Sequence, residues 1–114
     1  MPGETVVVKH TTDAFIGTGL EAHLRTAGGP VVVCGVITNN SVEATVRHAG
    51  CLGFETLLVE DACFTFARTD RRGHLWAAED VHALSLANLS GEYARIVTTP
   101  EALALAIAFS QRDS

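Results

Sequence analysis

The stretch of residues 31–47, VVVCGVITNNSVEATVR, constrains the fold of this chain more than any other. A run dominated by β-branched residues passes through Gly35, a short polar turn follows at residues 38–40, and a helical period begins at Ser41. This pattern is typical of a buried strand that leads into a helix through a tight connection. Open α/β sheets place their ligand-binding and catalytic residues at such connections. The residue at position 41 is therefore expected to matter most for function.

Strand-type and helix-type segments alternate along the whole chain. Strands are predicted at residues 5–9, 31–36, 56–59 and 94–98, and helices at residues 18–27, 41–52, 76–89 and 101–109. Thr18 and Glu21 have the spacing of a capping box, which predicts the start of the first helix. The alternation predicts one α/β domain, residues 1–114, in which a mostly parallel sheet lies between two helical layers. Doubly wound sheets usually have five or six strands, so the chain looks like the second part of a Rossmann-like domain truncated at its N-terminus.

Residues 61–73 have no hydrophobic period and carry three arginines, Arg68, Arg71 and Arg72. They are predicted to form a long surface loop. A loop of this length in a small domain is typical of a lid or an interface. Its arginines are expected to be solvated, with an anionic substrate group or a neighbouring subunit as the alternative partner.

The charge balance argues against two classes of partner. The chain has 13 acidic and 8 basic residues, a formal net charge of −5, whereas nucleic-acid and anionic-membrane surfaces need clustered Lys and Arg. No segment reaches the roughly 18 apolar residues of a membrane span, and the N-terminus has no signal-peptide pattern. The three cysteines form no C-x-x-C pair, which is typical of reduced, buried thiols. These features predict a cytoplasmic protein without nucleic-acid or membrane partners.

The sequence carries no recognisable metal or phosphate motif. No two histidines are spaced by three or four residues within one predicted helix, so surface or packing roles are expected for His10, His23, His48, His74 and His82. Neither G-x-G-x-x-G nor G-K-[ST] follows a predicted strand, which disfavours a nucleotide-binding α/β domain. We expect neither a metal nor a cofactor.

The residues of this stretch and its flanks resemble the isochorismatase-like cysteine hydrolases. That family has an apolar strand, Gly-Val-x-Thr-Asn, a nucleophilic Cys-Val, a helix with Thr-x-Arg and a strand that ends in Asp-Ala. The matching residues are Gly35, Val36, Thr38, Asn39, Val42, Thr45, Arg47, Gly53, Asp61 and Ala62, and upstream Lys9, Phe15, Gly17, Thr18 and Leu20. The downstream segment AEDVHALSLANL is similar to one branch of the family. The resemblance covers most of the chain in the right order.

The resemblance implies a hydrolase of small amides that uses an Asp-Lys-Cys triad. Lys9 matches the catalytic lysine, and position 41 matches the nucleophile. The backbone amides of Ile37 and Ser41 would form the oxyanion hole, with a cis peptide bond between Val36 and Ile37. The substrate-binding residues implied by the same match are Phe15, Thr38, Asn39 and Asn40. The family's metal-using members bind metal upstream of this segment, so no metal is implied here.

Two departures from the family concern the chemistry. Position 41 is serine, whose hydroxyl is far less ionised than a thiol and needs a base. The aspartate strand that the family places well before the lysine is not found in the sequence. Asp13 is an alternative base, and capping of the helix is an alternative role for Ser41. Two main hypotheses follow: a hydrolase whose site is completed by another chain, or a catalytically inactive binding or assembly module. Either hypothesis predicts a homo-oligomer or a complementing chain, because an interior strand would have an unpaired edge.

Overall fold

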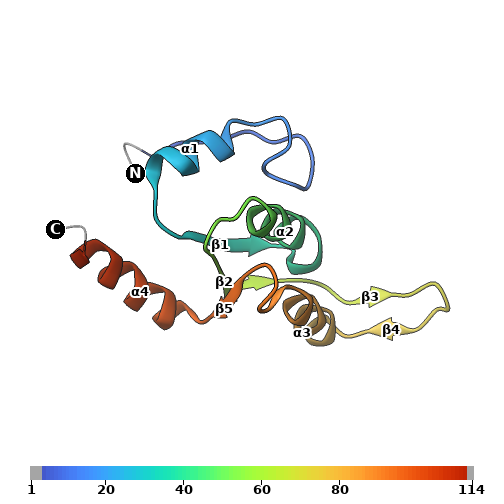
Figure 1. The fold of residues 1–114 in the computed structure, drawn as a ribbon. Helices are drawn as coiled ribbons and strands as arrows, with labels where there is room; N and C mark the ends of the chain where they lie inside the picture. The colour runs from blue at the N-terminus through green and yellow to red at the C-terminus, as the bar shows by residue number, and fades with distance from the viewer. Residues whose placement is uncertain (1–3, 113–114) are drawn as a thin grey trace.

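A three-stranded parallel sheet forms the centre of the protein in the computed structural model, which describes residues 4–112. The strands are β1 (Val31–Val36), β2 (Thr56–Phe64) and β5 (Arg95–Val97), in the order β1-β2-β5 (Figure 1). Both neighbouring pairs are parallel. The predicted α/β class with a mostly parallel sheet is therefore confirmed.

Helices cover both faces of β2, as the crossover rule requires. On one face, Leu58 packs with Val46 of α2 (Glu43–Cys51) and Leu89 of α3 (Ala78–Leu89). On the other face, Leu57 and Val59 pack with Ala102 of α4 (Thr99–Arg112). Successive side chains of a strand point to opposite faces, so the continuous apolar run of β2 serves both layers.

The strand β1 differs from the prediction of a strand buried on both faces. Val33 packs against the core between the sheet and α2, whereas Val32 and Val36 are 48% and 49% exposed. The reason is that β1 lies at the edge of the sheet, and no described helix covers its outer face. The outer face and the free edge of β1 are both open within residues 4–112.

The predicted strand at residues 5–9 is wrong. Residues 4–9 have no regular secondary structure, and Val6 and Val8 are 85% and 69% exposed. A strand needs a neighbour to accept and donate its backbone hydrogen bonds, and no described strand lies beside this segment. The predicted four parallel strands are therefore three in the described part of the chain.

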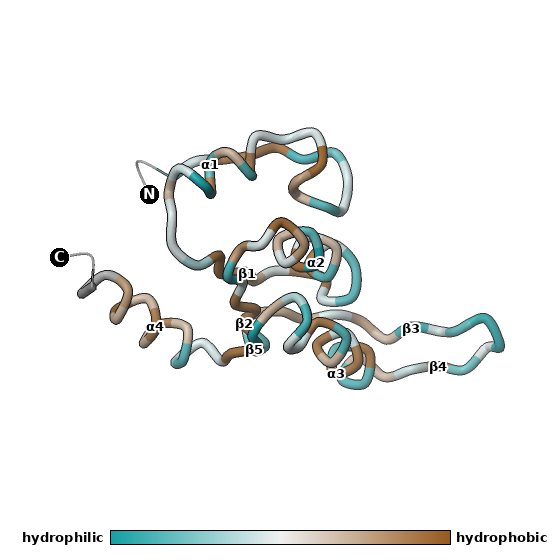
Figure 2. Tube along the Cα trace, viewed as in Figure 1, coloured by the Kyte–Doolittle hydropathy of each residue, from teal (hydrophilic) through white to brown (hydrophobic). Residues whose placement is uncertain are grey.

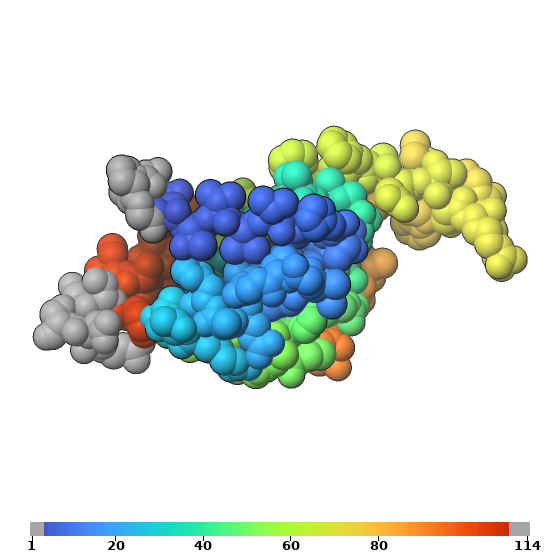
Figure 3. Space-filling model, turned by 90° about the horizontal axis from the view of Figure 1, so that it is seen from above, coloured from blue at the N-terminus to red at the C-terminus, as the bar shows by residue number. Residues whose placement is uncertain are grey.

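The predicted loop at residues 61–73 is also wrong. The strand β2 continues to Phe64, and β3 (Arg68–Thr69) pairs with β4 (Leu75–Trp76) in an antiparallel hairpin. The Asp70 carboxylate holds the turn, because it accepts hydrogen bonds from the backbone N–H of Arg72 and of His74 and from Trp76 Nε1. In Figures 1 and 3 the hairpin projects from the body of the molecule as an arm.

Three local predictions also need correction. The helix α1 (Leu20–Ala27) has Gly19 and not Thr18 at its N-cap, and the Thr18 hydroxyl donates to the Ala14 carbonyl and accepts the N–H of Leu20 at 3.3 Å. The predicted capping box with Glu21 does not form, because the Glu21 carboxylate pairs with Arg25. Cys34 and Cys51 are exposed, and only Cys63 is buried, although all three are free thiols. The helix predicted from Trp76 begins at Ala78 because Trp76 belongs to β4.

None of the helices in the described range is long and apolar enough to cross a membrane.

Candidate active site

The connection from β1 to α2 carries the candidate site. The peptide bond between Val36 and Ile37 is cis, as the family resemblance implies. A π-helical turn, η1 (Thr38–Val42), follows and runs directly into α2, so helical structure begins three residues earlier than predicted. Gly35 has a φ of 137°, a conformation that favours glycine. Beside it the pairing of β1 with β2 shifts register between Val33 and Gly35.

Ser41 is the fourth residue of η1, near the N-terminal end of this helical segment. Its Oγ donates a hydrogen bond to the carbonyl oxygen of Val36 at 2.8 Å. A carbonyl oxygen cannot take the proton from a hydroxyl, so this contact holds the side chain without activating it as a nucleophile. The positive end of the helix dipole would favour a developing anion at this position.

Lys9 and Ser41 line the same cavity, which has a volume of about 210 Å³. The remaining lining residues come from β1, η1, α2 and the loop before α1: Ala14, Val33, Cys34, Gly35, Val36, Val42 and Thr45. The Lys9 ammonium donates to the carbonyl oxygens of Thr11 and Thr12 at 3.0 and 3.2 Å. The cavity thus brings the predicted lysine and the predicted nucleophile position together, although no hydrogen bond joins their side chains.

The other predicted site residues lie elsewhere around the turn. Thr38 is fully buried, and Asn40 is exposed. Asn39 lines a separate groove of about 400 Å³ between the hairpin and α3. Phe15 is buried, and its ring contacts the rings of His48 and Phe54. Only Lys9 and Ser41 of the predicted set therefore face the cavity beside β1.

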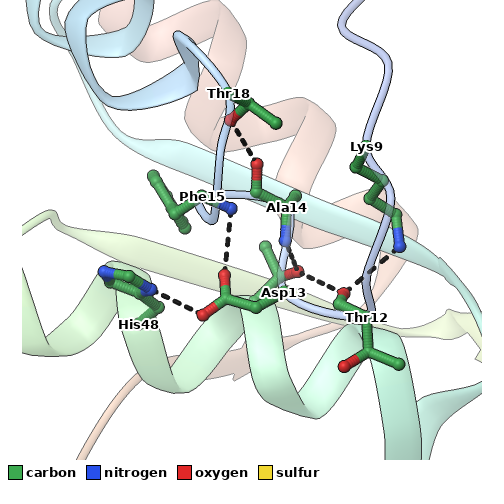
Figure 4. Close-up of polar contacts among 8 residues, drawn as sticks. Lys9, Thr12, Asp13, Ala14, Phe15, Thr18 and His48 are labelled. Atoms are coloured by element: carbon green, nitrogen blue, oxygen red, sulfur yellow. Dashed lines mark hydrogen bonds and ion pairs between the residues drawn. The ribbon is translucent and has the colours of Figure 1, made fainter.

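Asp13 does not replace the absent aspartate. Its Oδ2 lies 2.6 Å from His48 Nδ1, and its Oδ1 accepts the N–H of Phe15 at 2.9 Å (Figure 4). Both carboxylate oxygens are thus engaged, and Asp13 is not among the residues that line the cavity. Ser41 and His48 are seven residues apart on one helical segment, about 10 Å along its axis, so these residues do not form a Ser-His-Asp triad.

A polar network behind the turn was not found from the sequence. His82 Nε2 lies 3.1 Å from the Glu60 carbonyl oxygen, so it carries the proton and donates. With this tautomer, Nδ1 accepts the hydroxyl proton of Thr38 at 2.8 Å. Ser85 donates to the Glu43 carboxylate at 2.5 Å. His82 and Ser85 thus connect α3 to the turn and to α2, although they lie 44 and 42 positions from their partners in the sequence. Only the match of His82 to a family segment could have suggested these contacts.

Among the described residues, the charged and thiol groups around the site do not gather at one point. Within residues 4–112, no three His, Cys, Asp or Glu side chains are placed to share a metal ion. Burial raises the pKa of the Cys63 thiol, which keeps it protonated near neutral pH. Cys63 is therefore not a substitute nucleophile.

Comparisons with known proteins agree with this geometry. The family model described as "Isochorismatase domain" matches residues 1–101. A solved structure of a putative hydrolase of the isochorismatase family from Chromobacterium violaceum is 59% identical, with a TM-score of 0.86 over 91% of this chain and 54% of that one. The uncharacterized isochorismatase family protein YrdC of Bacillus subtilis is 37% identical over 89% of this chain and 54% of its own length. Nicotinamidase 3 of Arabidopsis thaliana is 34% identical over 82% of this chain and 42% of its own length.

The chain therefore spans about half the length of the relatives it matches. The range of the family model takes in Lys9, β1, the turn η1 and α2. From the family model, the identities and the fold together, we conclude that this chain belongs to the isochorismatase family.

Proposed function

We propose that this chain supplies three parts of a site that hydrolyses C–N bonds of small amides. These parts are the lysine, the turn η1 with the nucleophile position 41, and the oxyanion hole. The observation that carries the proposal is the cavity lined by both Lys9 and Ser41 at the end of β1. The likeness to a protein named nicotinamidase supports an amide substrate. Cys34, Cys51 and Cys63 are free thiols, which supports a cytoplasmic location.

The site would work by stabilising the oxyanion of the tetrahedral intermediate that forms when residue 41 attacks the amide carbon. Collapse of this intermediate expels ammonia or an amine, and water then hydrolyses the acyl group on residue 41. The backbone N–H groups of Ile37 and of position 41 would together donate to the oxyanion. The Lys9 ammonium would hold negative charge near the nucleophile. Phe15, Thr38, Asn39 and Asn40 would bind or shape the substrate site. No metal or cofactor takes part in this proposal.

We propose further that the chain alone is inactive. The Ser41 hydroxyl donates to the Val36 carbonyl instead of to a base, and the Asp13 carboxylate is held by His48 and Phe15. Serine without a matched base is a weak nucleophile. The single 1–114 domain would then be incomplete, with the aspartate strand provided by another chain that pairs with the free edge of β1. The partner is a complementing chain or a second copy in a homo-oligomer.

A second candidate is a non-catalytic binding or assembly module derived from the family. The exposed Val32 and Val36 on the outer face of β1 favour it, because such apolar surface is normally covered by a partner. In this alternative the cavity beside Ser41 has no substrate, and the unpaired edge alone determines function.

Substitution of Ser41 by cysteine separates the two candidates. The assay measures ammonia release from nicotinamide and other small amides, with the chain alone and mixed with the segment of the Bacillus subtilis relative that this chain does not cover. We expect the Ser41→Cys variant to turn over amide when the segment is present, and to be about 10²–10⁴-fold slower without it, the range that a general base contributes.

The matched control is Ser41→Cys combined with Lys9→Met, which is expected to lose the turnover of the single variant. If Ser41→Cys stays inert with the added segment, although the two polypeptides bind each other, the module is favoured. If Ser41→Cys is as fast alone as with the segment, the proposed need for a second chain is wrong.

A further inference from the structure

The loop between Lys9 and α1 is fastened to α2 by polar contacts that the proposed chemistry does not use. Asp13 Oδ2 and His48 Nδ1 lie 2.6 Å apart, and the carboxylate can only accept, so Nδ1 donates. Thr45 Oγ1 accepts the N–H of Ala14 at 3.1 Å and donates to the carbonyl oxygen of Thr12 at 3.4 Å. Figure 4 shows the loop lying against α2, with the Asp13 and His48 side chains directed toward each other.

Both residues of the Asp13–His48 pair are held by further contacts. Asp13 Oδ1 accepts the N–H of Phe15 at 2.9 Å, which fixes the carboxylate relative to its own backbone. The buried Phe15 ring lies 4.9 Å from the His48 ring, centroid to centroid. A hydrogen-bonded carboxylate and an aromatic contact thus converge on one imidazole. The ring of His48 is therefore the point of α2 at which both kinds of contact from the loop meet.

The position of Lys9 depends on this loop. Residues 4–9 have no regular secondary structure, so no sheet or helix holds the lysine. Its ammonium instead donates to the carbonyl oxygens of Thr11 and Thr12, and Thr12 is the residue that Thr45 also binds. A continuous path of contacts leads from α2 through the loop to the Lys9 ammonium in the cavity.

We propose that His48 is a positioning residue: its pair with Asp13 anchors the loop on α2 and so holds the Lys9 ammonium beside residue 41. This inference rests on the proposed role of Lys9 in the site. It assigns His48 a function other than proton transfer, since its donor nitrogen is directed at Asp13 and it does not line the cavity.

The test measures the pKa of a thiol placed at position 41. The full chain carries Ser41→Cys, Cys34→Ser and Cys51→Ser, so that the other remaining thiol is the buried Cys63. The rate of alkylation by iodoacetamide as a function of pH gives the pKa of the introduced thiol. A nearby ammonium favours the thiolate, so we expect a pKa below the usual value of about 8.5.

In this background, His48→Ala is expected to raise the pKa of the introduced thiol by about one unit, as Lys9→Met does. His48→Asn keeps a donor close to the position of Nδ1, and we expect it to restore at least half of the shift. The control is His23→Ala, because His23 is an exposed histidine on α1 and should leave the pKa unchanged. Rescue by asparagine separates loss of the hydrogen bond to Asp13 from a general loss of structure, which asparagine would not reverse.

The outcomes separate the inference from the proposed function. If Lys9→Met raises the pKa and His48→Ala does not, the positioning role of His48 is wrong while the role of Lys9 stands. If Lys9→Met has no effect, the proposed role of Lys9 fails and the inference fails with it. Should His48→Ala not fold, Asp13→Ala removes the acceptor of the same pair, and an unchanged pKa in that variant overturns the inference.

Discussion

Thr38 is the buried residue through which the turn η1 contacts α3. Its side chain has no exposed surface, and its hydroxyl donates to His82 Nδ1 at 2.8 Å. Replacing the hydroxyl by a methyl group would leave the Nδ1 acceptor of the partly buried His82 without its protein partner. An unpaired buried acceptor costs more than the hydrogen bond itself contributes.

We therefore expect Thr38→Val to lower the free energy of unfolding by about 1–3 kcal/mol. Urea denaturation measures this change. Thr26→Val is the matched control, because Thr26 is exposed on α1 and its hydroxyl donates only to the carbonyl of Ala22 in the same helix. Equal losses in the two variants would contradict the account of the turn.

At the level of single residues, sequence reasoning found the groups that match a family pattern and missed those that act through contacts. Lys9 and Ser41 were predicted by resemblance, and the cavity brings them together. The Asp13–His48 pair joins residues 35 positions apart, and neither residue has a motif of its own. Such pairs depend on how a loop lies on a helix, which local sequence does not determine.

One side chain, that of Asp70, orders the hairpin β3–β4, which the composition of this segment did not predict. The Asp70 carboxylate accepts from Trp76 Nε1 and from the backbone of Arg72 and His74, and these bonds hold the pKa of Asp70 below its ordinary value. A run rich in arginine and aspartate reads as a loop, because strand prediction relies on apolar alternation. The four strand residues of the hairpin were therefore missed, whereas the long apolar runs of β1 and β2 were not.

The hairpin is expected to open in acid. Since the pKa of Asp70 is lower in the folded hairpin, its contribution is complete above the ordinary aspartate pKa of about 3.9 and is lost as the pH falls through the lower folded value. Trp76 is the only tryptophan in the sequence, so its fluorescence reports on the hairpin. We expect an emission change only below about pH 4.

Asp70→Asn should abolish that acid transition, while Glu55→Gln, which removes an exposed carboxylate outside the hairpin, should leave it in place. A transition centred between pH 5 and 7 would instead indicate a histidine and would exclude Asp70 as its cause.

The whole molecule is elongated, with principal extents of 54 × 31 × 28 Å. Apolar side chains remain on its surface: Leu103 and Ile107 of α4 are 60% and 59% exposed, and Figure 2 shows hydrophobic residues along that helix. Together with the outer face of β1, they resemble surfaces that another polypeptide normally covers. The chain spans about half the length of its relatives, and we propose that a segment like their other half covers these surfaces.

The central proposal is that a further polypeptide segment completes the sheet, and with it the site at Ser41. Sedimentation velocity at micromolar concentration tests it most directly, with the chain alone and after addition of the uncovered segment of the Bacillus subtilis relative. We predict self-associated species for the chain alone, and a smaller, defined complex once the segment is added. A compact monomer of 12.1 kDa whose sedimentation does not change on addition of the segment would contradict the claim.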